Sequence, residues 1–335
     1  GAYDMQLKPE DFTNTNTNFA DVTFVIVDGQ LVINPIDVTV TITEHSDEAD
    51  YDGKEHTVTG YDVEIGNELY TEADFTFSGN AAVSAVDAGV YDMLLTSGNF
   101  TNKSPNFANV EFVIVDGQLT INKRNVTLTS ASDSKEYDGI ALTAKTVEIT
   151  AGSFAPNEGY TVNITGSQTL VGKSDNTFTY ALTQNTKSGN YEITVVYGEL
   201  QVTDRTEPFV VVVEANSGEH VYDGQPFTVS GLKEATVARM AARIDGQTVT
   251  FLLNGETYTI SGLHAERTET HVNPAAPTAV DVLPYSGYEV AITGTPVITD
   301  SEGNDVTKQF TVETISGLMT IHPAPVTMVS GDATK

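Results

Sequence analysis

Apolar and polar residues alternate in short runs along most of this chain, and turn-forming residues interrupt the runs about every ten positions. Successive side chains of a β-strand point to opposite faces, so this pattern predicts half-buried strands. Thr, Val, Ile, Tyr and Phe dominate the runs, and these residues are enriched in strands. The chain is therefore predicted to be all-β, with one exception in its last third.

The alternating pattern also repeats itself. Residues 20–34, ADVTFVIVDGQLVIN, recur 88 positions later as ANVEFVIVDGQLTIN in residues 108–122. The differences between the copies fall on the side of the strand opposite Val22, Phe24 and Ile26. Copies that keep one face and vary the other are typical of tandem modules with a common core.

Two shorter elements mark the period of the repeat. A Tyr-Asp-Gly triplet occurs at 51–53, 137–139 and 222–224, and a Gly-x-Leu-x-Ile/Val element closes each unit at 29–33, 117–121, 198–202 and, with Met in place of Leu, 317–321. These spacings predict modules at residues 35–122, 123–203 and 204–322, the last with an insertion at about 232–278. Residues 1–34 are predicted to be the closing part of a truncated repeat, and residues 323–335 the opening strand of a following one.

The triplet itself has a structural interpretation. Glycine supplies a backbone conformation that other residues resist, and the aspartate caps the turn through its carboxylate. The tyrosine plugs the end of a core and keeps its hydroxyl at the edge. We favour this interpretation over a binding role.

Asp-Gly and Asn-Gly pairs between strand-like runs predict tight hairpins, because a type I′ turn needs a positive φ at both central residues. Asp28-Gly29 and Asp116-Gly117 are predicted to form such turns in the closing elements. Asn254-Gly255, between residues 250–253 and 257–260, predicts a hairpin inside the insertion.

The insertion also holds the one exception to the strand pattern. Residues 233–244, KEATVARMAARI, place Val237, Met240, Ala241 and Ile244 on one helical stripe, and Gly246 follows as a stop. We therefore predict a helix there.

Charge and composition narrow the range of functions. The chain has 46 acidic and 16 basic residues and a net charge of -30, which repels nucleic acid and anionic membrane surfaces. It has no cysteine, so it offers no disulfide, thiolate zinc site or cysteine nucleophile. No apolar run reaches the length of about 18 residues that a membrane span needs.

Catalytic and cofactor-binding motifs are absent from the sequence. The six histidines show no paired ligand spacing, and there is no Gly-x-Ser-x-Gly, phosphate-binding or dinucleotide-binding motif. Carboxylates are so numerous that no pair of them stands out as a general acid and base. The chain is predicted not to be an enzyme and to need no cofactor.

One acidic loop resembles the oxygen-rich loops that bind calcium. Residues 300–305, DSEGND, gather Asp300, Glu302, Asn304 and Asp305 around a glycine. The loop lacks EF-hand spacing and a distal bidentate glutamate. A calcium site and a plain acidic turn are therefore alternatives, and we favour the turn.

The order of motifs in the middle module resembles a known family of bacterial surface repeats, the MBG or YDG domains. The matching elements are Lys135 with the triplet 137–139, then Gly159-Tyr160, then 189–191 (GNY), then 198–202. The match is full in the middle module and partial in the other two, where the lysine before the triplet is missing and the GNY element is altered.

This resemblance implies a repeated stalk or adhesive region of a secreted or surface protein in an extracellular location, without enzymatic activity. An immunoglobulin-like β-sandwich and a β-grasp unit are both compatible with such repeats. A β-grasp needs a helix on its sheet, and two of the three modules show no helical stripe, so we prefer tandem sandwiches.

A carbohydrate-binding accessory array is the alternative function. Its ligand surface would lie in the inserted last module, at Phe251, Tyr258, His264 and Tyr285. The partner would then be a host glycan or a protein ligand, and an open concavity rather than a closed core would be expected around these side chains.

The two ends of the chain predict association through strands. Residues 1–34 carry an apolar face, including Phe24 and Ile26, for which this segment has no opening strand. We expect this face to dock on the next module or to pair with another molecule, and residues 325–330 are the candidate complement by strand addition.

Overall fold

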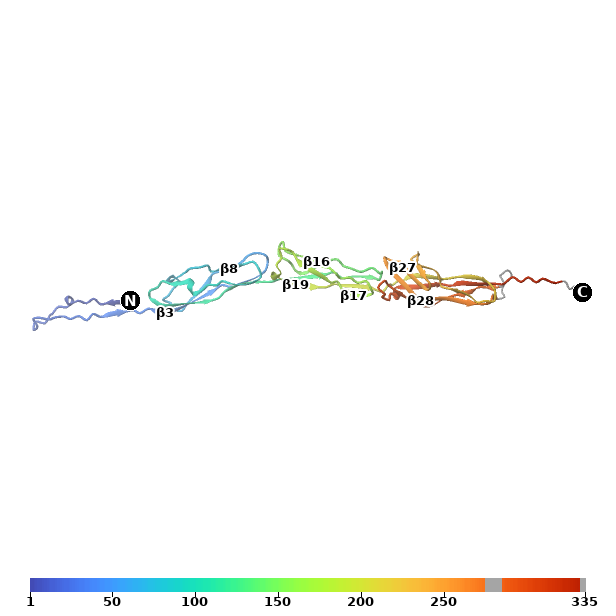
Figure 1. The fold of residues 1–335 in the computed structure, drawn as a ribbon. Coiled ribbons are helices and arrows are strands. Elements are labelled where there is room, and N and C mark those ends of the chain that lie inside the picture. Colours follow the sequence, from blue (N-terminus) through green and yellow to red (C-terminus); the bar gives the residue numbers. More distant parts are fainter. Residues whose placement is uncertain (275–284, 332–335) are drawn as a thin grey trace. The chain divides into compact units, whose positions relative to one another are not determined.

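The computed structural model describes residues 1–274 and 285–331 and consists mainly of β-strands (Figure 1). Every helical segment in these residues is a single 3-10 turn of three residues. The all-β prediction is confirmed. Within the same residues, no helix has the length and apolar character needed to cross a bilayer.

The chain divides into two compact units. Unit 1 comprises residues 1–128, 149–161 and 181–195, and unit 2 comprises residues 129–148, 162–180 and 196–335. The division runs through the module predicted at 123–203, so each unit contains a complete neighbouring module together with part of this one.

Unit 1 is built from short strands and four 3-10 turns. The strands are β1 (Ala2–Asp4), β2 (Gln30–Val32), β3 (Ile36–Glu44), β4 (Asp47–Asp50), β5 (His56–Thr59), β6 (Tyr61–Ile65), β7 (Phe75–Phe77), β8 (Ala82–Ala85), β9 (Gly89–Asp92), β10 (Phe100–Asn102), β11 (Phe107–Val115) and β12 (Gln118–Asn122). The turns are η1 (Pro9–Asp11), η2 (Glu72–Asp74), η3 (Ser97–Asn99) and η4 (Ser188–Asn190). Five strands have residues in both units: β13 (Arg124–Ser130), β15 (Val147–Gly152), β16 (Tyr160–Ile164), β18 (Phe178–Leu182) and β19 (Tyr191–Val196).

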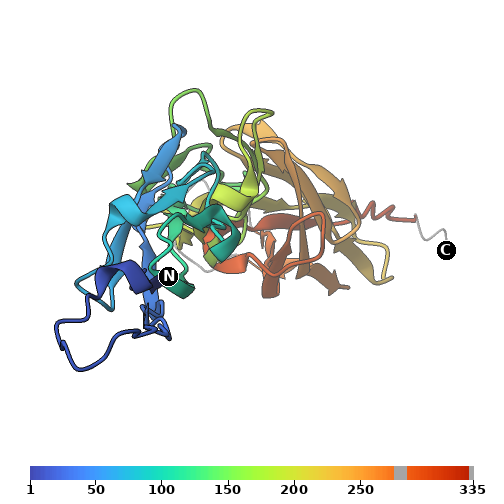
Figure 2. The same cartoon turned by 90° about the vertical axis from the view of Figure 1, so that its left-hand side faces the viewer.

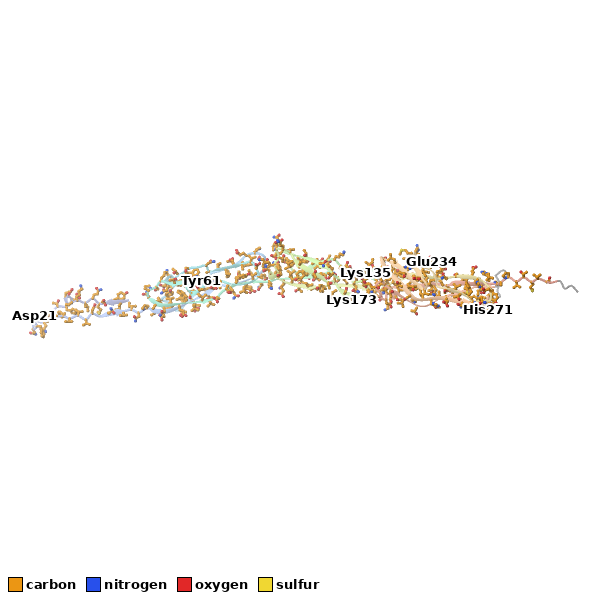
Figure 3. All side chains as sticks on the ribbon, viewed as in Figure 1. Asp21, Tyr61, Lys135, Lys173, Glu234 and His271 are labelled. Atoms are coloured by element: carbon orange, nitrogen blue, oxygen red, sulfur yellow. The ribbon has the colours of Figure 1, made fainter. Side chains whose placement is uncertain are left out.

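The opening strand of the module at 35–122 lies parallel to its closing strands. β3 pairs in parallel with β11 and antiparallel with β6, and β4 pairs in parallel with β12, whose other neighbour is β9. Val38, Val40 and Ile42 alternate with threonines along β3 and are buried, each contributing about 1.5–3 kcal/mol to folding. Aromatic rings fill the core beside them; Tyr61, labelled in Figure 3, packs against Phe77 and Phe100.

Unit 2 repeats this plan and adds the insertion. Its further strands are β14 (Asp133–Glu136), β17 (Gly172–Asp175), β20 (Glu199–Thr203), β21 (Phe209–Ala215), β22 (Gly218–Val221), β23 (Phe227–Ser230), β24 (Leu232–Val237), β25 (Met240–Ala241), β26 (Arg243–Asp245), β27 (Thr248–Leu253), β28 (Glu256–Glu269), β29 (Asn273–Pro274), β30 (Tyr285–Ser286), β31 (Tyr288–Val290), β32 (Ile292–Thr299), β33 (Phe310–Ile315) and β34 (Gly317–His322), with one turn, η5 (Thr307–Gln309). β21 pairs in parallel with β33, and β22 with β34. Figure 2 shows the last module, yellow to red, as layers of strands.

The predicted helix at 233–244 is wrong, because these residues form β24, β25 and β26. β24 pairs antiparallel with β21, so Ala235 and Val237 are buried against the core. Ala238 and Arg239 then turn the chain with φ values of 51° and 69°, which a right-handed helix does not allow. Met240 is exposed, so the helical stripe does not form a face. Pairing with the sheet overrides the local helical pattern.

The hairpin predicted at Asn254-Gly255 is confirmed. β27 and β28 pair antiparallel with Leu253 opposite Glu256, and the two turn residues have φ values of 53° and 89°. Both values are positive, as a type I′ turn requires.

The hairpins predicted in the closing elements are wrong. β11 and β12 lie in different sheets and pair with β3, and with β4 and β9, rather than with each other. None of the four closing glycines has a positive φ. A Cβ at Gly117 would collide with the backbone carbonyls of Glu44 and His45. Glycine is needed there for close backbone approach where the chain changes sheets.

Candidate functional site at the module junctions

Three of the four side chains predicted to form a ligand surface are described, and they lie in different surroundings. Phe251 and Tyr258 are buried in the core, where their rings stack with centroids 5.3 Å apart. His264 is exposed on β28, opposite Thr293 of β32. The side chain of Tyr285 lies outside the described part of the structure. The two buried aromatic rings therefore offer no contact area to a ligand.

The acidic loop at 300–305 uses its oxygens to hold its own turn. Asp300 Oδ1 accepts hydrogen bonds from the backbone N–H groups of Glu302 at 3.0 Å and Asn304 at 2.8 Å, and its Oδ2 accepts one from Asn304 Nδ2. Asp305 Oδ1 accepts from the N–H of Thr307 at 2.9 Å, and hydrogen bonding from the side chain and then the backbone of Thr307 lowers the pKa of Asp305. In the described residues, no three His, Cys, Asp or Glu side chains are arranged to hold a metal ion.

The three Tyr-Asp-Gly triplets form the same local turn. In each, the aspartate Oδ1 accepts a hydrogen bond of 2.9 Å from the N–H two residues further on, and the glycine has φ near +80°. The tyrosine N–H donates to the carbonyl of the closing-strand residue: Tyr51 to Asn122, Tyr137 to Thr203 and Tyr222 to His322. The roles that the sequence predicts for glycine and aspartate are observed in all three copies.

The tyrosine side chain of the first triplet reaches beyond its own module. In unit 1, Tyr51 donates a 2.5 Å hydrogen bond to Glu158 Oε1, while Tyr191 donates to Oε2 of the same carboxylate at 2.6 Å. The two rings meet edge to face with centroids 5.5 Å apart. Burial and the shared carboxylate raise the pKa of both hydroxyls, so both remain hydrogen-bond donors at neutral pH.

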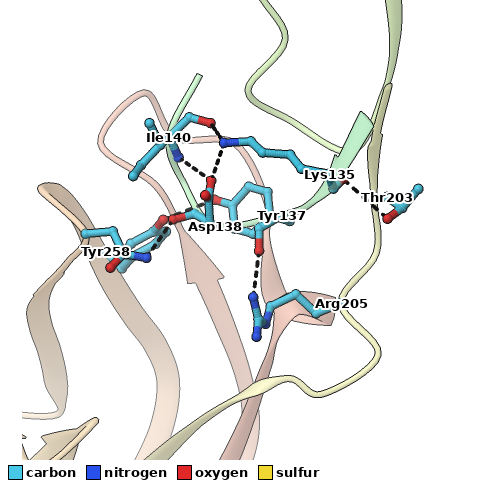
Figure 4. Close-up of polar contacts among 8 residues, drawn as sticks. Lys135, Tyr137, Asp138, Ile140, Thr203, Arg205 and Tyr258 are labelled. Carbon is cyan, nitrogen blue, oxygen red and sulfur yellow. Dashed lines mark hydrogen bonds and ion pairs between the residues drawn. The ribbon is translucent and has the colours of Figure 1, made fainter. Parts of the chain in front are cut away.

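The second triplet makes the corresponding contact in unit 2 (Figure 4). The hydroxyls of Tyr137 and Tyr258 lie 3.2 Å apart, and burial raises the pKa of each. Asn254 Nδ2 donates to the carbonyl of Asp138 at 3.0 Å. Gly139 faces Tyr258 so closely that a Cβ there would collide with the hydroxyl. The hairpin of the inserted region thus packs on the turn of the preceding module.

An arginine binds the backbone of the turn at both junctions. Arg124 Nη1 donates to the Tyr51 carbonyl at 3.3 Å, and Arg205 Nη1 donates to the Tyr137 carbonyl at 3.0 Å. Each arginine lies two residues after the closing strand of the module that carries the turn. Arg124 also donates to Ser153 Oγ at 2.7 Å.

A buried amide side chain forms a second contact shared by both junctions. Asn190 accepts a hydrogen bond from the N–H of Ala88 at 2.8 Å and donates to Asp87 Oδ1 at 2.9 Å. Gln309 accepts from the N–H of Arg205 at 3.0 Å and donates to Asp204 Oδ1 at 2.7 Å. Both amides lie at the end of a 3-10 turn, η4 or η5. Each donates to an aspartate carboxylate and accepts from the backbone N–H of the residue that follows this aspartate. We call this pair of bonds the amide clamp.

The third triplet forms the same turn, and no second module packs on it in the part of the chain that the structure describes. Tyr51 and Tyr137 are 3% and 1% exposed, whereas Tyr222 is 38% exposed. No atom lies within 4 Å of a Cβ built on Gly224. The second residue after His322 is Ala324, not arginine. The turn therefore forms without a second module packed on it in the described residues, and its tyrosine stays partly exposed.

Sequence reasoning missed the junction contacts, although two signals were present. Arg124 and Arg205 recur two residues after a closing strand, and Asn190 and Gln309 each precede an aromatic residue at the start of a strand. The network holds two modules together through neutral hydroxyls, amides, carboxylates and arginines.

Comparisons with known proteins leave these junctions as the main guide to function. The same contact types, an arginine on a turn carbonyl and an amide clamp, recur where one module meets the next. A scan against protein families finds no match, and no curated protein matches the chain significantly.

Proposed function

We propose that this chain is a non-enzymatic repeat region of a bacterial cell-surface or secreted protein that acts as a spacer, in the manner of the MBG or YDG repeats it resembles. The observation that carries the proposal is the recurrence, at both junctions, of a buried tyrosine, an arginine on the turn carbonyl and an amide clamp. Contacts built twice in the same way indicate that the junction itself is a selected feature.

The junction chemistry suits a spacer. Each tyrosine is desolvated between two modules, and loss of a buried hydrogen bond there costs about 1–3 kcal/mol. Several such bonds at each junction resist bending between neighbouring modules. The net charge of -30 supports the same role, because mutual repulsion keeps an array soluble and discourages lateral association.

The arrangement of strands within one module is part of this proposal. In both complete modules the opening strand pairs in parallel with closing strands, whereas an immunoglobulin-like sandwich is built from antiparallel sheets. The described residues also lack the long helix that a β-grasp carries on its sheet. We infer an all-β module with first-to-last parallel pairing, related to the β-grasp alternative by this pairing alone.

An adhesive role would be an addition to the spacer role. The carbohydrate-binding alternative loses two of its four candidate side chains to the core, Phe251 and Tyr258. A glycan array probed with the full chain would test adhesion separately from spacing.

Small-angle X-ray scattering of the full chain, compared with a variant that loses Arg124 and Arg205, tests the spacer role. We expect the parent to scatter as one preferred conformation and the double Arg→Ala variant to scatter as a broader ensemble with an unchanged content of β-structure. A parent that scatters like a freely jointed chain, or no difference between the two proteins, would contradict the proposal.

A further inference from the structure

The junction in unit 1 gathers two tyrosine side chains around one carboxylate. Tyr51 and Tyr191 are 3% and 4% exposed, and their rings meet edge to face with centroids 5.5 Å apart. Their hydroxyls donate to the two oxygens of Glu158 at 2.5 Å and 2.6 Å. Because both hydroxyls converge on one carboxylate, the ortho ring carbons beside these hydroxyls converge as well.

The carboxylate can accept the protons of both phenols. A phenol that loses an electron becomes a strong acid, and a base already in hydrogen-bond contact with it takes the proton. Burial raises the pKa of Tyr51 and of Tyr191, so at neutral pH both protons are in place when an electron leaves. Glu158 is half-buried, so it can pass each proton on to water.

A row of aromatic rings connects this pair to a less buried tyrosine. The ring of Tyr191 packs against Phe154 with centroids 4.9 Å apart, and Phe154 stacks on Tyr160 at 5.5 Å. Tyr160 is partly exposed. An oxidant at the surface can therefore draw electrons from the buried pair through rings in contact. The sequence has no cysteine and no tryptophan, two side chains that would compete for the oxidant.

We propose that this junction is a site of oxidative tyrosine cross-linking, at which a one-electron oxidant driven by hydrogen peroxide joins Tyr51 to Tyr191. Each phenol loses one electron to the oxidant and one proton through Glu158, and the two phenoxyl radicals form a bond between ortho carbons. The hydrogen on each joined carbon then moves to the phenolic oxygen, which restores both hydroxyls. The two electrons and two protons reduce one hydrogen peroxide to two waters. The reaction is independent of the spacer role.

Two other tyrosine sites of the repeat supply comparisons within the same chain. The hydroxyls of Tyr137 and Tyr258 lie 3.2 Å apart, so the acceptor for one phenol is the other phenol, a weaker base than a carboxylate. The ring of Tyr222 lies beside His271, which cannot form a dityrosine. We therefore expect cross-linking to be fastest at the pair that shares Glu158.

Oxidation of the dilute full chain by a haem peroxidase and hydrogen peroxide, followed by proteolysis and mass spectrometry, tests the reaction. We expect a linked pair of peptides that contain Tyr51 and Tyr191, lighter than the two separate peptides by two hydrogen atoms, from chains that remain monomeric. Tyr191→Phe should abolish this product. Tyr222→Phe makes the same change at the third triplet and should leave the yield unchanged.

The role of the proton acceptor is tested separately from that of proximity. Glu158→Gln keeps the size of the side chain and removes the base, so the initial rate of coupling is expected to fall at least about tenfold. Glu192→Gln, at an exposed position next to Tyr191, should leave the rate unchanged. Circular dichroism should show the same β-structure in both variants. A parent that yields no link between Tyr51 and Tyr191, a Glu158→Gln variant that couples at the parent's rate, or a link that forms first at the other junction would each overturn the proposal.

Discussion

The turns at Tyr137 and Tyr222 are the same structure in two surroundings. Both have the aspartate cap, the glycine with φ near +80° and the tyrosine N–H bonded to the closing strand. The first is covered by the hairpin that carries Tyr258, whereas in the described residues no second module packs on the second turn, whose tyrosine ring lies beside His271. The comparison separates what the triplet does for its own module from what it does for the junction: the turn is local, and the burial of the tyrosine is not.

Substituting the glycines should break this comparison most strongly. Gly224→Ala should lower the free energy of unfolding by about 1 kcal/mol, because alanine is strained at the positive φ of this position. Gly139→Ala should lower the free energy of unfolding by about 3 kcal/mol, because the same strain is joined by a collision of the new Cβ with the Tyr258 hydroxyl. Gly53→Ala, whose Cβ would lie 3.3 Å from that of Ala155, is expected to fall between them. Urea unfolding of the three variants measures the order, and equal shifts would contradict it.

Removing the amide clamp should have the next largest effect. Gln309→Leu leaves the N–H of Arg205 and the carboxylate of Asp204 without their partner, at a cost of about 2 kcal/mol. Gln225→Leu, in the third triplet's turn, changes the same side-chain type at an exposed position and should cost less than about 0.5 kcal/mol. Hydrogen exchange at Arg205 should accelerate in the first variant only; unchanged exchange would show that the clamp does not secure the junction.

Removing one hydroxyl sharpens the comparison further. Tyr137→Phe loses the bond to the Tyr258 hydroxyl and should cost about 1 kcal/mol. Tyr222→Phe alters a partly exposed ring and should be neutral within about 0.5 kcal/mol. Thermal unfolding of the pair gives the difference, and similar shifts in the two variants would argue against a junction role for the hydroxyl.

The smallest expected effect is the pH dependence of stability at the junction that contains Tyr51 and Asp87. Hydrogen bonds from Lys187 and then from Asn190 lower the pKa of Asp87 in the folded state. The unfolded value is about 3.9, so this contribution to stability is present above that pH and is lost as the pH falls through the lower folded pKa. Solvent screens the exposed Lys187–Asp87 pair, so the loss should be small. Asp87→Asn should flatten the acid limb of the stability profile; an unaltered limb would exclude this carboxylate.

The sequence predicts local structure here better than it predicts partners. Strand alternation identifies the all-β fold, and the Asn254-Gly255 hairpin follows from turn chemistry alone. The stripe around Val237 mimics a helix, and only pairing with β21 decides against it. At Gly117 the sequence suggests a turn where the structure needs backbone clearance. The periodicity of apolar residues indicates which side of a segment is buried, but it does not identify the element that packs against that side.

The groups that meet the junction tyrosines and the clamp amides could not be predicted for a related reason. The tyrosine triplet is visible in the sequence, but Glu158 and Tyr258, which meet the two covered tyrosines, come from different elements of their modules. The carboxylate of the clamp precedes β9 in one junction and follows β20 in the other. The partners of the tyrosines and of the clamp amides therefore come from non-equivalent positions in the two junctions, and no fixed sequence spacing identifies these partners.

The arginines bind a main-chain carbonyl, and the clamp amides accept from a main-chain N–H. Every residue type except proline has both main-chain groups, so these two contacts of each junction do not depend on which side chain the contacted residue carries. A gene segment encoding one module can therefore be duplicated, deleted or exchanged in frame without a matched set of compensating mutations at its new border. The length of the array becomes a property that recombination can adjust.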